Sequence, residues 1–443
     1  MKKIFILFFS FLLVFPIKAQ DDFLIDANKN KVKIPFKLIN NLVFIPIVVN
    51  GVELNFLLDS GVEETILFSM EDKKEVSFNN VQKIKLRGLG SEEEIEGLKS
   101  TKNVLESHGL KSTNQLVYII LDQSFNMSSQ IGIPVNGIIG YRFFKNNIIE
   151  INYQTKKILV HRENHQVRSR LQKKFKSYTI SVEKSKPYIN TTAVVDETEI
   201  PAKLLIDIGN SDSFWIFDND RIKLPEKNFA DFLGKGFSGD IEGHRAKILK
   251  FYLGDFAFKN PIVSFPDPVS IKNVKMVTGR IGSVGGEILK RFRVVMDYPD
   301  KKMYLKPNNK FKDPFTYNKS GVTIQHNGLQ WVQETVHFEM VNVTNPGRTE
   351  VKEDLKNREQ DFKYKFQLKP VYEIVNVRKG SAAEKSGLQK GDVIISINNN
   401  KPYKYSLDQI NHLLKSEDDI WINLEIERNN LLLKFRFRLE EEL

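Results

Sequence analysis

The feature that most constrains the fold is an internal repeat in the first two-thirds of this 443-residue chain. Residues 137–160 align without a gap with residues 282–305, at an offset of 145 positions. Earlier in each copy, Phe56–Gly61 (FLLDSG) and Leu205–Gly209 (LIDIG) match at an offset of 148. The later segments share identical residues at Gly137/Gly282, Gly140/Gly285, Lys145/Lys290, Tyr153/Tyr298, Lys156/Lys301 and Lys157/Lys302. Two separate matches at nearly one offset predict two homologous lobes, at residues 30–162 and 176–308.

The local pattern of both lobes is typical of β-strands. Short runs rich in β-branched and aromatic residues, such as Leu42–Val49 and Leu116–Leu121, are bounded by Gly, Asn, Asp and Pro. Long amphipathic patterns are few. The basic segment Val167–Lys176 between the lobes lacks a strand pattern, and we expect an exposed connector there. The sequence therefore predicts a mainly β fold.

Each copy of the repeat contains an apolar strand that ends in an Asp–x–Gly turn. The two carboxylates belong to Asp59 and Asp207, and Gly61 and Gly209 allow tight turns and close approach of another chain. If the turns face each other across a pseudo-two-fold axis, the carboxylates lie about 3 Å apart and share one proton. The ionised carboxylate can then take a proton from water while the protonated one polarises a peptide carbonyl. Such chemistry needs neither a metal nor a covalent intermediate.

These motifs resemble the pepsin-like and retropepsin-like aspartic peptidases. In that family each lobe contributes one Asp from an Asp–Thr/Ser–Gly turn, and a later apolar–apolar–Gly segment supports the turn. Asp59–Gly61 matches the turn, Ile138–Gly140 matches the supporting segment, and Ser283–Gly285 matches it less well. The tandem arrangement resembles bacterial members that also carry a PDZ domain. The resemblance covers roughly residues 40–308 and implies a pair of β-barrel lobes. It also implies a polypeptide substrate, catalytic Asp59 and Asp207, no cofactor and no metal.

The second lobe departs from the pattern of the family. Ile208 stands where the family has Thr or Ser, whose hydroxyls brace the two turns, so only Ser60 can supply this brace. Val62 and Asn210 follow the two glycines, and only Asn210 can hydrogen-bond a carboxylate. Two hypotheses follow. The chain is an active aspartic endopeptidase, or it is a catalytically impaired peptidase fold that binds peptides.

A peptidase of this type needs a flap that covers the substrate and excludes water. Glycine-rich segments at residues 87–90 and 234–243 lie between the Asp–x–Gly turn and the supporting segment, where the family places its flap. An ordinary surface hairpin is the alternative. The second segment also spells G-x-G-x-x-G, but no βαβ pattern surrounds it, which argues against a dinucleotide site. The candidate flap residues are Gly88, Gly90, Gly236 and Gly239.

The C-terminal part resembles a PDZ domain, predicted at residues 318–443. Arg378–Asn398 contains Gly-Ser-x-Ala, a short helix that ends at Gly387, and a Gly391-Asp392 turn into a strand. Ser406–Leu414 suits the helix that lines the peptide groove. Residues 345–365 are highly charged, and we expect a flexible insertion there.

PDZ domains bind a C-terminal or extended peptide as an added strand and hold its carboxylate in a backbone nest. We expect Gly321 to belong to the loop that forms this nest. The strand that follows contains Val322 and Ile324, which are the candidate peptide-binding residues. The resemblance thus predicts a peptide partner that is recruited to the chain or regulates it.

The N-terminus is typical of a cleaved signal peptide, predicted at residues 1–19. Lys2 and Lys3 precede the apolar run Ile4–Phe15, and Ala19 is a small residue at the cleavage position. We therefore expect a secreted or periplasmic protein; an uncleaved anchor is the alternative. No later run approaches the roughly 20 apolar residues of a membrane-spanning helix, so no span is expected after removal of the signal.

Composition excludes several classes of function. The net charge is +11, but Lys and Arg are interleaved with Glu and Asp, so a mixed solvated surface is expected and no nucleic-acid partner. The seven histidines are scattered without metal-binding spacing. The chain has no cysteine, which excludes a catalytic thiol and disulfides. No G-x-S-x-G elbow or phosphate-binding loop is present.

Overall fold

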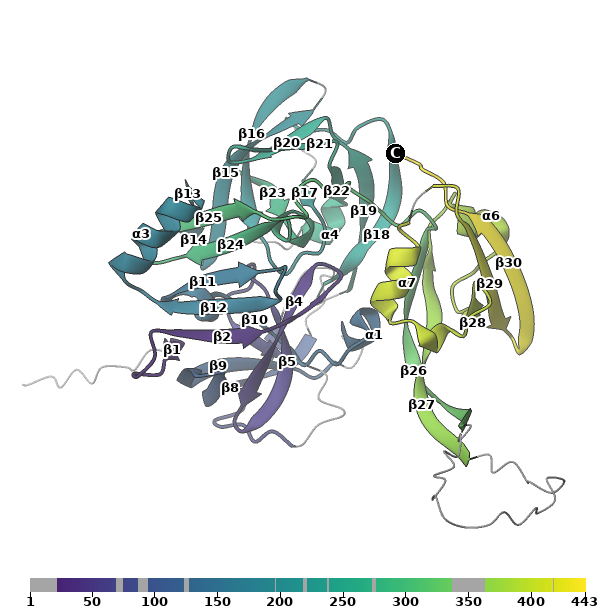
Figure 1. The fold of residues 1–443 in the computed structure, drawn as a ribbon, viewed down its shortest axis with the longest axis horizontal. Helices are drawn as coiled ribbons and strands as arrows, with labels where there is room; N and C mark the ends of the chain where they lie inside the picture. The colour runs from purple at the N-terminus through teal and green to yellow at the C-terminus, as the bar shows by residue number, and fades with distance from the viewer. Residues whose placement is uncertain are drawn as a thin grey trace, which may run out of the picture.

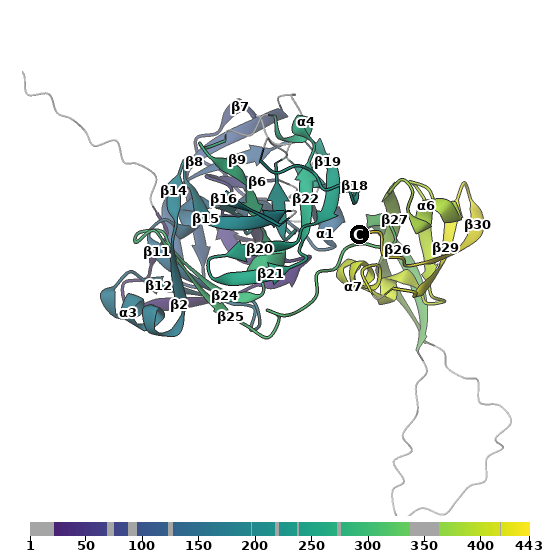
Figure 2. The same cartoon turned by 90° about the horizontal axis from the view of Figure 1, so that it is seen from above.

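The structure is a computed structural model in which a large body is followed by a smaller C-terminal unit (Figures 1 and 2). The predicted signal peptide and most of the charged stretch at residues 345–365 lie outside the described residues. The fold is mainly β, which confirms the prediction from the strand patterns. The structure describes residues 22–68, 75–86, 95–122, 127–195, 197–217, 221–236, 239–272, 276–336, 363–416 and 418–443.

The first lobe is built on a nine-stranded sheet. At its centre β10 runs parallel to β5 and antiparallel to β6, and β6 runs parallel to β9. A short helix, α1 (Met127–Ile131), lies between β9 and β10. The strands are β1 (Leu24–Ile25), β3 (Lys37–Ile39), β4 (Leu42–Val49), β5 (Val52–Leu58), β6 (Thr65–Leu67), β7 (Gln82–Leu86), β8 (Ile95–Ser107), β9 (Leu110–Ile120) and β10 (Gly137–Ile139).

The second lobe repeats this arrangement in a ten-stranded sheet. Here β23 runs parallel to β16 and antiparallel to β17, and β17 runs parallel to β22. The repeat in the sequence thus corresponds to one strand order used twice. The strands are β14 (Ser181–Glu183), β15 (Lys186–Val195), β16 (Thr198–Ile206), β17 (Phe214–Ile216), β18 (Asn228–Gly236), β19 (Gly239–Lys247), β20 (Lys250–Leu253), β21 (Phe256–Lys259), β22 (Ile262–Pro266) and β23 (Arg280–Val284), with the helix α4 (Pro268–Ile271) after β22.

A six-stranded sheet joins the two lobes, in the order β13-β25-β24-β11-β12-β2. At its centre Glu150 of β11 lies opposite Val295 of β24, its own equivalent in the repeat. The flanking pairs, Ile148 with Asp297 and Asn152 with Arg293, are related to each other by the same offset. The pairing is therefore two-fold symmetric. The strands are β2 (Lys31–Pro35), β11 (Asn147–Asn152), β12 (Lys157–Arg162), β13 (Lys176–Thr179), β24 (Phe292–Asp297) and β25 (Lys302–Pro307).

The segment between the lobes is more regular than an exposed connector. It forms the helix α3 (His165–Lys174) and continues into β13. The side chain of Asn164 caps the helix by accepting a hydrogen bond of 2.8 Å from the Val167 N–H. Leu171 is buried against Ile148 and Val295, so the helix covers one face of the joining sheet. The predicted connector is thus part of the packing between the lobes.

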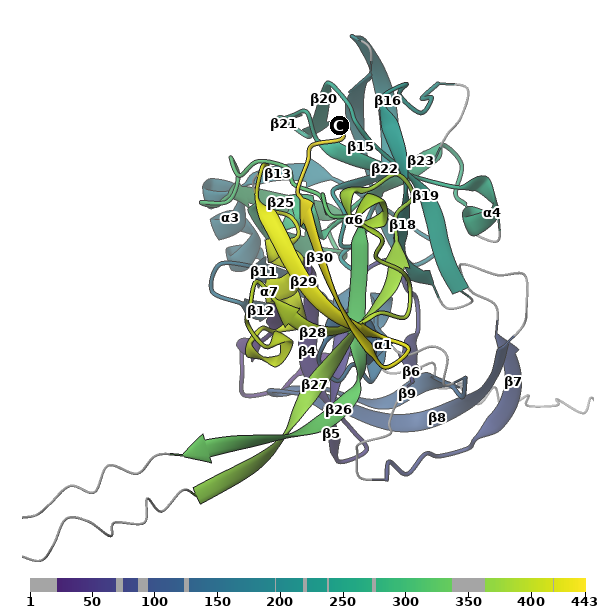
Figure 3. The same ribbon diagram turned by 90° about the vertical axis from the view of Figure 1, so that its right-hand side faces the viewer.

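The two lobes share one hydrophobic core, whereas the C-terminal unit has its own. This unit is a five-stranded sheet in the order β26-β27-β28-β29-β30, and its first hairpin projects away from the body (Figure 3). The helix α6 ends at Gly387 with a φ of 98°, and Ser406 forms a capping box at the start of α7. The elements are β26 (Val322–Val336), β27 (Lys363–Val377), α6 (Ala382–Ser386), β28 (Val393–Ile397), η1 (Pro402–Lys404), α7 (Leu407–Leu413), β29 (Trp421–Arg428) and β30 (Leu431–Arg438).

Among the described residues, no helix is both long enough and apolar enough to cross a membrane. The other short helices, α2 (Tyr141–Phe144) and α5 (Gly286–Leu289), occupy equivalent places after β10 and β23.

The joining sheet gives a prediction for stability. Ile151 of β11 is fully buried and pairs with Val294 of the other lobe. We expect Ile151→Ala to lower the free energy of unfolding by about 3 kcal/mol, because it removes buried methyl groups and leaves a cavity. The exposed Lys306 of β25 is the control, and Lys306→Ala is expected to change it by less than about 0.5 kcal/mol. Denaturant unfolding followed by circular dichroism measures both; equal effects would contradict the role of the sheet.

Candidate active site

Equivalent strands carry Asp59 and Asp207 to the middle of the body. Asp59 directly follows β5, and its N–H donates a hydrogen bond of 2.9 Å to the carbonyl of Ile139 in β10. Asp207 directly follows β16, and its N–H donates a hydrogen bond of the same length to the carbonyl of Val284 in β23. Each carboxyl group is therefore fixed by a pair of parallel strands.

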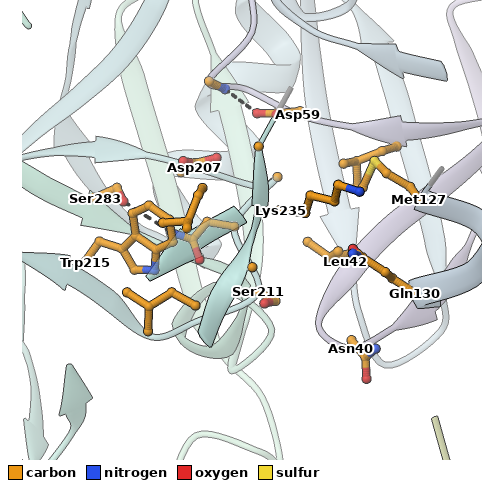
Figure 4. A pocket seen from close by; sticks show the side chains of 18 of the residues that line it. Asn40, Leu42, Asp59, Met127, Gln130, Asp207, Ser211, Trp215, Lys235 and Ser283 are labelled. Carbon is orange, nitrogen blue, oxygen red and sulfur yellow. Dashed lines mark hydrogen bonds between the residues drawn. The ribbon is translucent and has the colours of Figure 1, made fainter. Parts of the chain in front are cut away.

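The structure brings the two carboxyl groups together, and they hydrogen-bond to each other. Their side chains lie next to each other at the cavity in Figure 4. The two turn glycines make this approach feasible. A Cβ atom at Gly209 would lie 2.2 Å from Cγ of Asp59, and one at Gly61 would lie 3.3 Å from Oδ1 of Asp207. Any larger residue at Gly209 would thus collide with the opposite carboxyl group.

Ser60 braces the two turns from one side. Its Oγ donates a hydrogen bond of 2.6 Å to the carbonyl of Ile206 and accepts one of 3.0 Å from the N–H of Ile208. Ser60 is completely buried, and the side chain of Ile208 packs into the core. The hydroxyl of Ser60 therefore holds the backbone on both sides of Asp207. The side chain of Ile208 forms no equivalent hydrogen bond to the first lobe.

The supporting segments press against both turns. A Cβ atom at Gly140 would lie 1.9 Å from the carbonyl oxygen of Val62, and one at Gly285 would lie 2.4 Å from that of Asp212. Asn210 hydrogen-bonds within the second lobe: its Oδ1 accepts from the N–H of Asp212, and its Nδ2 donates to Ser283. In the described structure Asn210 thus stabilises its own turn and does not bond either paired carboxylate.

The electrostatic environment keeps a proton on the pair. Burial and the negative charge of Asp207 raise the pKa of Asp59 to about 8, against the opposing effects of the Gly61 N–H and Lys186. Burial also raises the pKa of Asp207, opposed by the charges of Arg280 and Lys186. Because the two groups interact strongly, they titrate as one unit. Burial therefore favours the protonated form of both groups.

A cavity of about 370 Å³ opens above the two carboxyl groups. Apolar side chains of both lobes line it, and Figure 4 shows Met127 and Trp215 on opposite sides. The β18–β19 hairpin also lines the cavity, through Gly234, Lys235 and Gly236. Gly236 pairs with Gly239 at the end of this hairpin, so the second candidate flap reaches the cavity that contains the carboxyl groups. Gly88 and Gly90 of the first candidate flap lie outside the described residues.

Two basic residues that the sequence patterns did not reveal also line the cavity. Lys186 begins β15 and Arg280 begins β23, and both influence the pKa of Asp207. Neither residue belongs to a motif, because each stands alone at the start of a strand. Only the long-range pairing of the strands brings them to the two carboxyl groups. Within the described residues, no cluster of three or more His, Asp or Glu side chains has the geometry of a metal site.

In the C-terminal unit the predicted carboxylate loop is internally hydrogen-bonded. Gly321 has a φ of 79°, and its N–H and that of Ser320 both donate to Oδ1 of Asn318, at 3.2 and 3.1 Å. The side chains of Val322 and Ile324 are buried in the core of the unit, so only their backbone could meet a peptide along the strand. This burial follows from the alternation of β26, which directs both residues inward.

A part of the first lobe lies at the groove of the C-terminal unit. A Cβ atom at Gly132, just after α1, would lie 3.0 Å from Cβ of Leu407 in α7 and 3.5 Å from Nε2 of His326 in β26. Gly132 therefore sits between the strand and the helix that would enclose a peptide. Thr323, Ile324 and Asn411 also line the cavity of the two carboxyl groups.

The comparisons with known proteins identify one part of the chain. The family described as "PDZ domain" matches residues 373–428, so the chain contains a PDZ domain in its C-terminal unit. This match confirms the prediction made from Arg378–Asn398. The matched segment runs from β27 to β29 and includes both helices, α6 and α7. A search of the curated proteins finds no match.

The one-sided brace gives a prediction for the site. Ser60→Ala leaves the buried N–H of Ile208 and the carbonyl of Ile206 without their partner, and we expect a loss of about 2 kcal/mol in the free energy of unfolding. Ser211→Ala is the control, since the side chain of this cavity-lining serine forms no hydrogen bond between the lobes and its backbone carbonyl, which accepts from Asn41, is kept; it should change stability by less than about 0.5 kcal/mol. Urea denaturation measures both, and identical midpoints for the two variants would refute the brace.

Proposed function

We propose that the two lobes form an exported aspartic endopeptidase that hydrolyses peptide bonds in polypeptide substrates. The observation that carries this proposal is the hydrogen-bonded pair of Asp59 and Asp207, which equivalent turns bring to the floor of one cavity. Two interacting carboxyl groups with raised pKa values are a signature of acid–base catalysis. The predicted signal peptide supports export.

The proposed reaction uses the single proton of the pair. The ionised carboxylate takes a proton from a water molecule held between the two groups, and that water attacks the peptide carbonyl. The protonated carboxyl group donates to the carbonyl oxygen as negative charge develops there. The β18–β19 hairpin would act as a flap over the bound chain, and its position along the cavity supports this role.

The PDZ domain is proposed to recruit or regulate. PDZ domains bind peptides as an added strand, and Thr323 and Ile324 of β26 line the same cavity as Asp59 and Asp207. Because Gly132 of the first lobe lies between β26 and α7, a peptide would enter this groove only after the first lobe moves away from it. The alternative is a peptide-binding protein with impaired catalysis. It is favoured by one observation, the missing hydroxyl at Ile208.

Substitution of either aspartate separates these alternatives. We expect Asp59→Asn and Asp207→Asn each to reduce the cleavage of an unfolded protein substrate such as casein by about 10³-fold or more, because each removes one half of the proton-sharing pair. Asp255→Asn is the control, since Asp255 lies on the surface in an ion pair with Lys176. Cleavage is followed by mass spectrometry of the products. Activity that persists in both active-site variants would exclude the proposed mechanism.

The raised pKa values predict the pH dependence of cleavage. The pair is active with one proton, so kcat/KM should fall as pH rises through about 8, where Asp59 ionises beside Asp207. On the acid side activity should fall as the pair gains a second proton. This should occur above the ordinary aspartate pKa, about 3.9, because burial also raises the pKa of Asp207. Rates of peptide cleavage between pH 3 and 10 test this. An alkaline limb below pH 6 would contradict the electrostatic argument.

A further inference from the structure

The cavity contains two cations, Lys186 and Arg280, that form no ion pair in the described structure. None of the hydrogen bonds and ion pairs formed by the described residues involves the ammonium group of Lys186, which is half-buried at the start of β15. Arg280 donates from Nε to the carbonyl of Gly282 at 3.0 Å, and its guanidinium group lies 5.1 Å from the ring centroid of Phe217. No carboxylate of the described structure lies within ion-pair distance of either residue.

Two other partly buried cations of the same lobe form ion pairs. Arg245 forms ion pairs with Asp212 and Asp231, and Lys203, which lies opposite Arg280 in the β16–β23 pair, forms one with Glu183. Burying a charge without a partner is unfavourable, so proteins normally pair such groups. Lys186 and Arg280 differ from Arg245 and Lys203 because both line the cavity and neither forms an ion pair.

The two catalytic candidates cannot neutralise both cations. Burial lowers the pKa of Lys186 and of Arg280, and the charges of Asp59 and Asp207 act against this effect on Lys186. When the two carboxyl groups share one proton, as the proposed mechanism requires, they supply one negative charge against the two cations Lys186 and Arg280. One positive charge is left over in a half-enclosed cavity, where the interaction with an anion is stronger than in water.

We propose that Lys186 and Arg280 form a subsite for an acidic side chain, so that the substrates are polypeptides with Glu or Asp next to the cleaved bond. This proposal rests on the proposed function. Both cations belong to the second lobe, whereas the described part of the first lobe contributes no lysine or arginine to the cavity and lines it with apolar residues such as Leu42, Met127 and Ile138. The preferred sequence thus has an acidic residue on one side of the cleaved bond and an apolar residue on the other.

The test uses the full chain and pairs of fluorogenic peptides that differ only by Glu or Gln at the positions flanking the cleaved bond. We expect kcat/KM to be about tenfold or more higher for the Glu peptide, because Gln would leave the cations without a counter-charge. Lys186→Met and Arg280→Met should each bring the ratio close to one. Lys306→Met removes an exposed strand lysine and should keep the ratio of the wild type. Each variant is assayed at its own optimal pH, because Lys186 also influences the pKa of Asp59.

A binding measurement separates this proposal from the proposed function. Asp59→Asn protein is titrated with fluorescein-labelled Glu and Gln peptides, and anisotropy should show tighter binding of the Glu peptide. Cleavage without discrimination between Glu and Gln would overturn the subsite and leave the peptidase proposal intact. Absence of all cleavage, together with preferred binding of the Glu peptide, would overturn the peptidase proposal and support the subsite. If Lys186→Met fails to fold, the wild-type ratio and Arg280→Met still decide.

Discussion

The structure depends on the pairing of β11 with β24, in which equivalent positions of the repeat meet. Glu150 and Val295 lie opposite each other, so a two-fold rotation about this pair relates the strand pairing of one half to that of the other. Because this register is two-fold symmetric, it also relates the two Asp–x–Gly turns by the same rotation. A slip of one residue would turn every side chain of these strands to the other face. The approach of Asp59 and Asp207 is thus a consequence of the joining sheet.

The close approach of Asp59 and Asp207 is electrostatically unfavourable. Two carboxyl groups held together in a cavity have a less favourable electrostatic free energy than two solvated ones. Backbone hydrogen-bond donors and cations offset part of this effect, while the two groups stay close together. The Gly61 N–H donates to Oδ1 of Asp59 at 2.7 Å, and Ser60 fixes the backbone on both sides of Asp207. Lys186 and Arg280 offset the charge that remains. Strain of this kind is typical of functional sites.

The sequence predicted the features that local patterns encode. The mainly β fold and the PDZ domain are confirmed, because alternating strands and the Gly-Ser-x-Ala segment are local signals. The helix α3 was missed because Leu171 is its one fully buried residue among basic and polar neighbours, which leaves no apolar period. Lys186 and Arg280 were missed for a different reason. Lys186 and Arg280 reach the same cavity because β15, β16 and β23 lie side by side. The pairing of segments that are distant in the sequence produces no local pattern in either segment.

The PDZ domain forms part of the wall of the cavity. Arg378, beside its predicted carboxylate loop, pairs with Asp231 of the β18–β19 hairpin and with Glu442. Lys247 at the end of the same hairpin pairs with Glu441. The hairpin that lines the cavity of Asp59 and Asp207 is therefore connected near its base to the C-terminal unit, whose strand β26 also lines the cavity. Since these ion pairs connect the two, a displacement of the PDZ domain would also act on this hairpin.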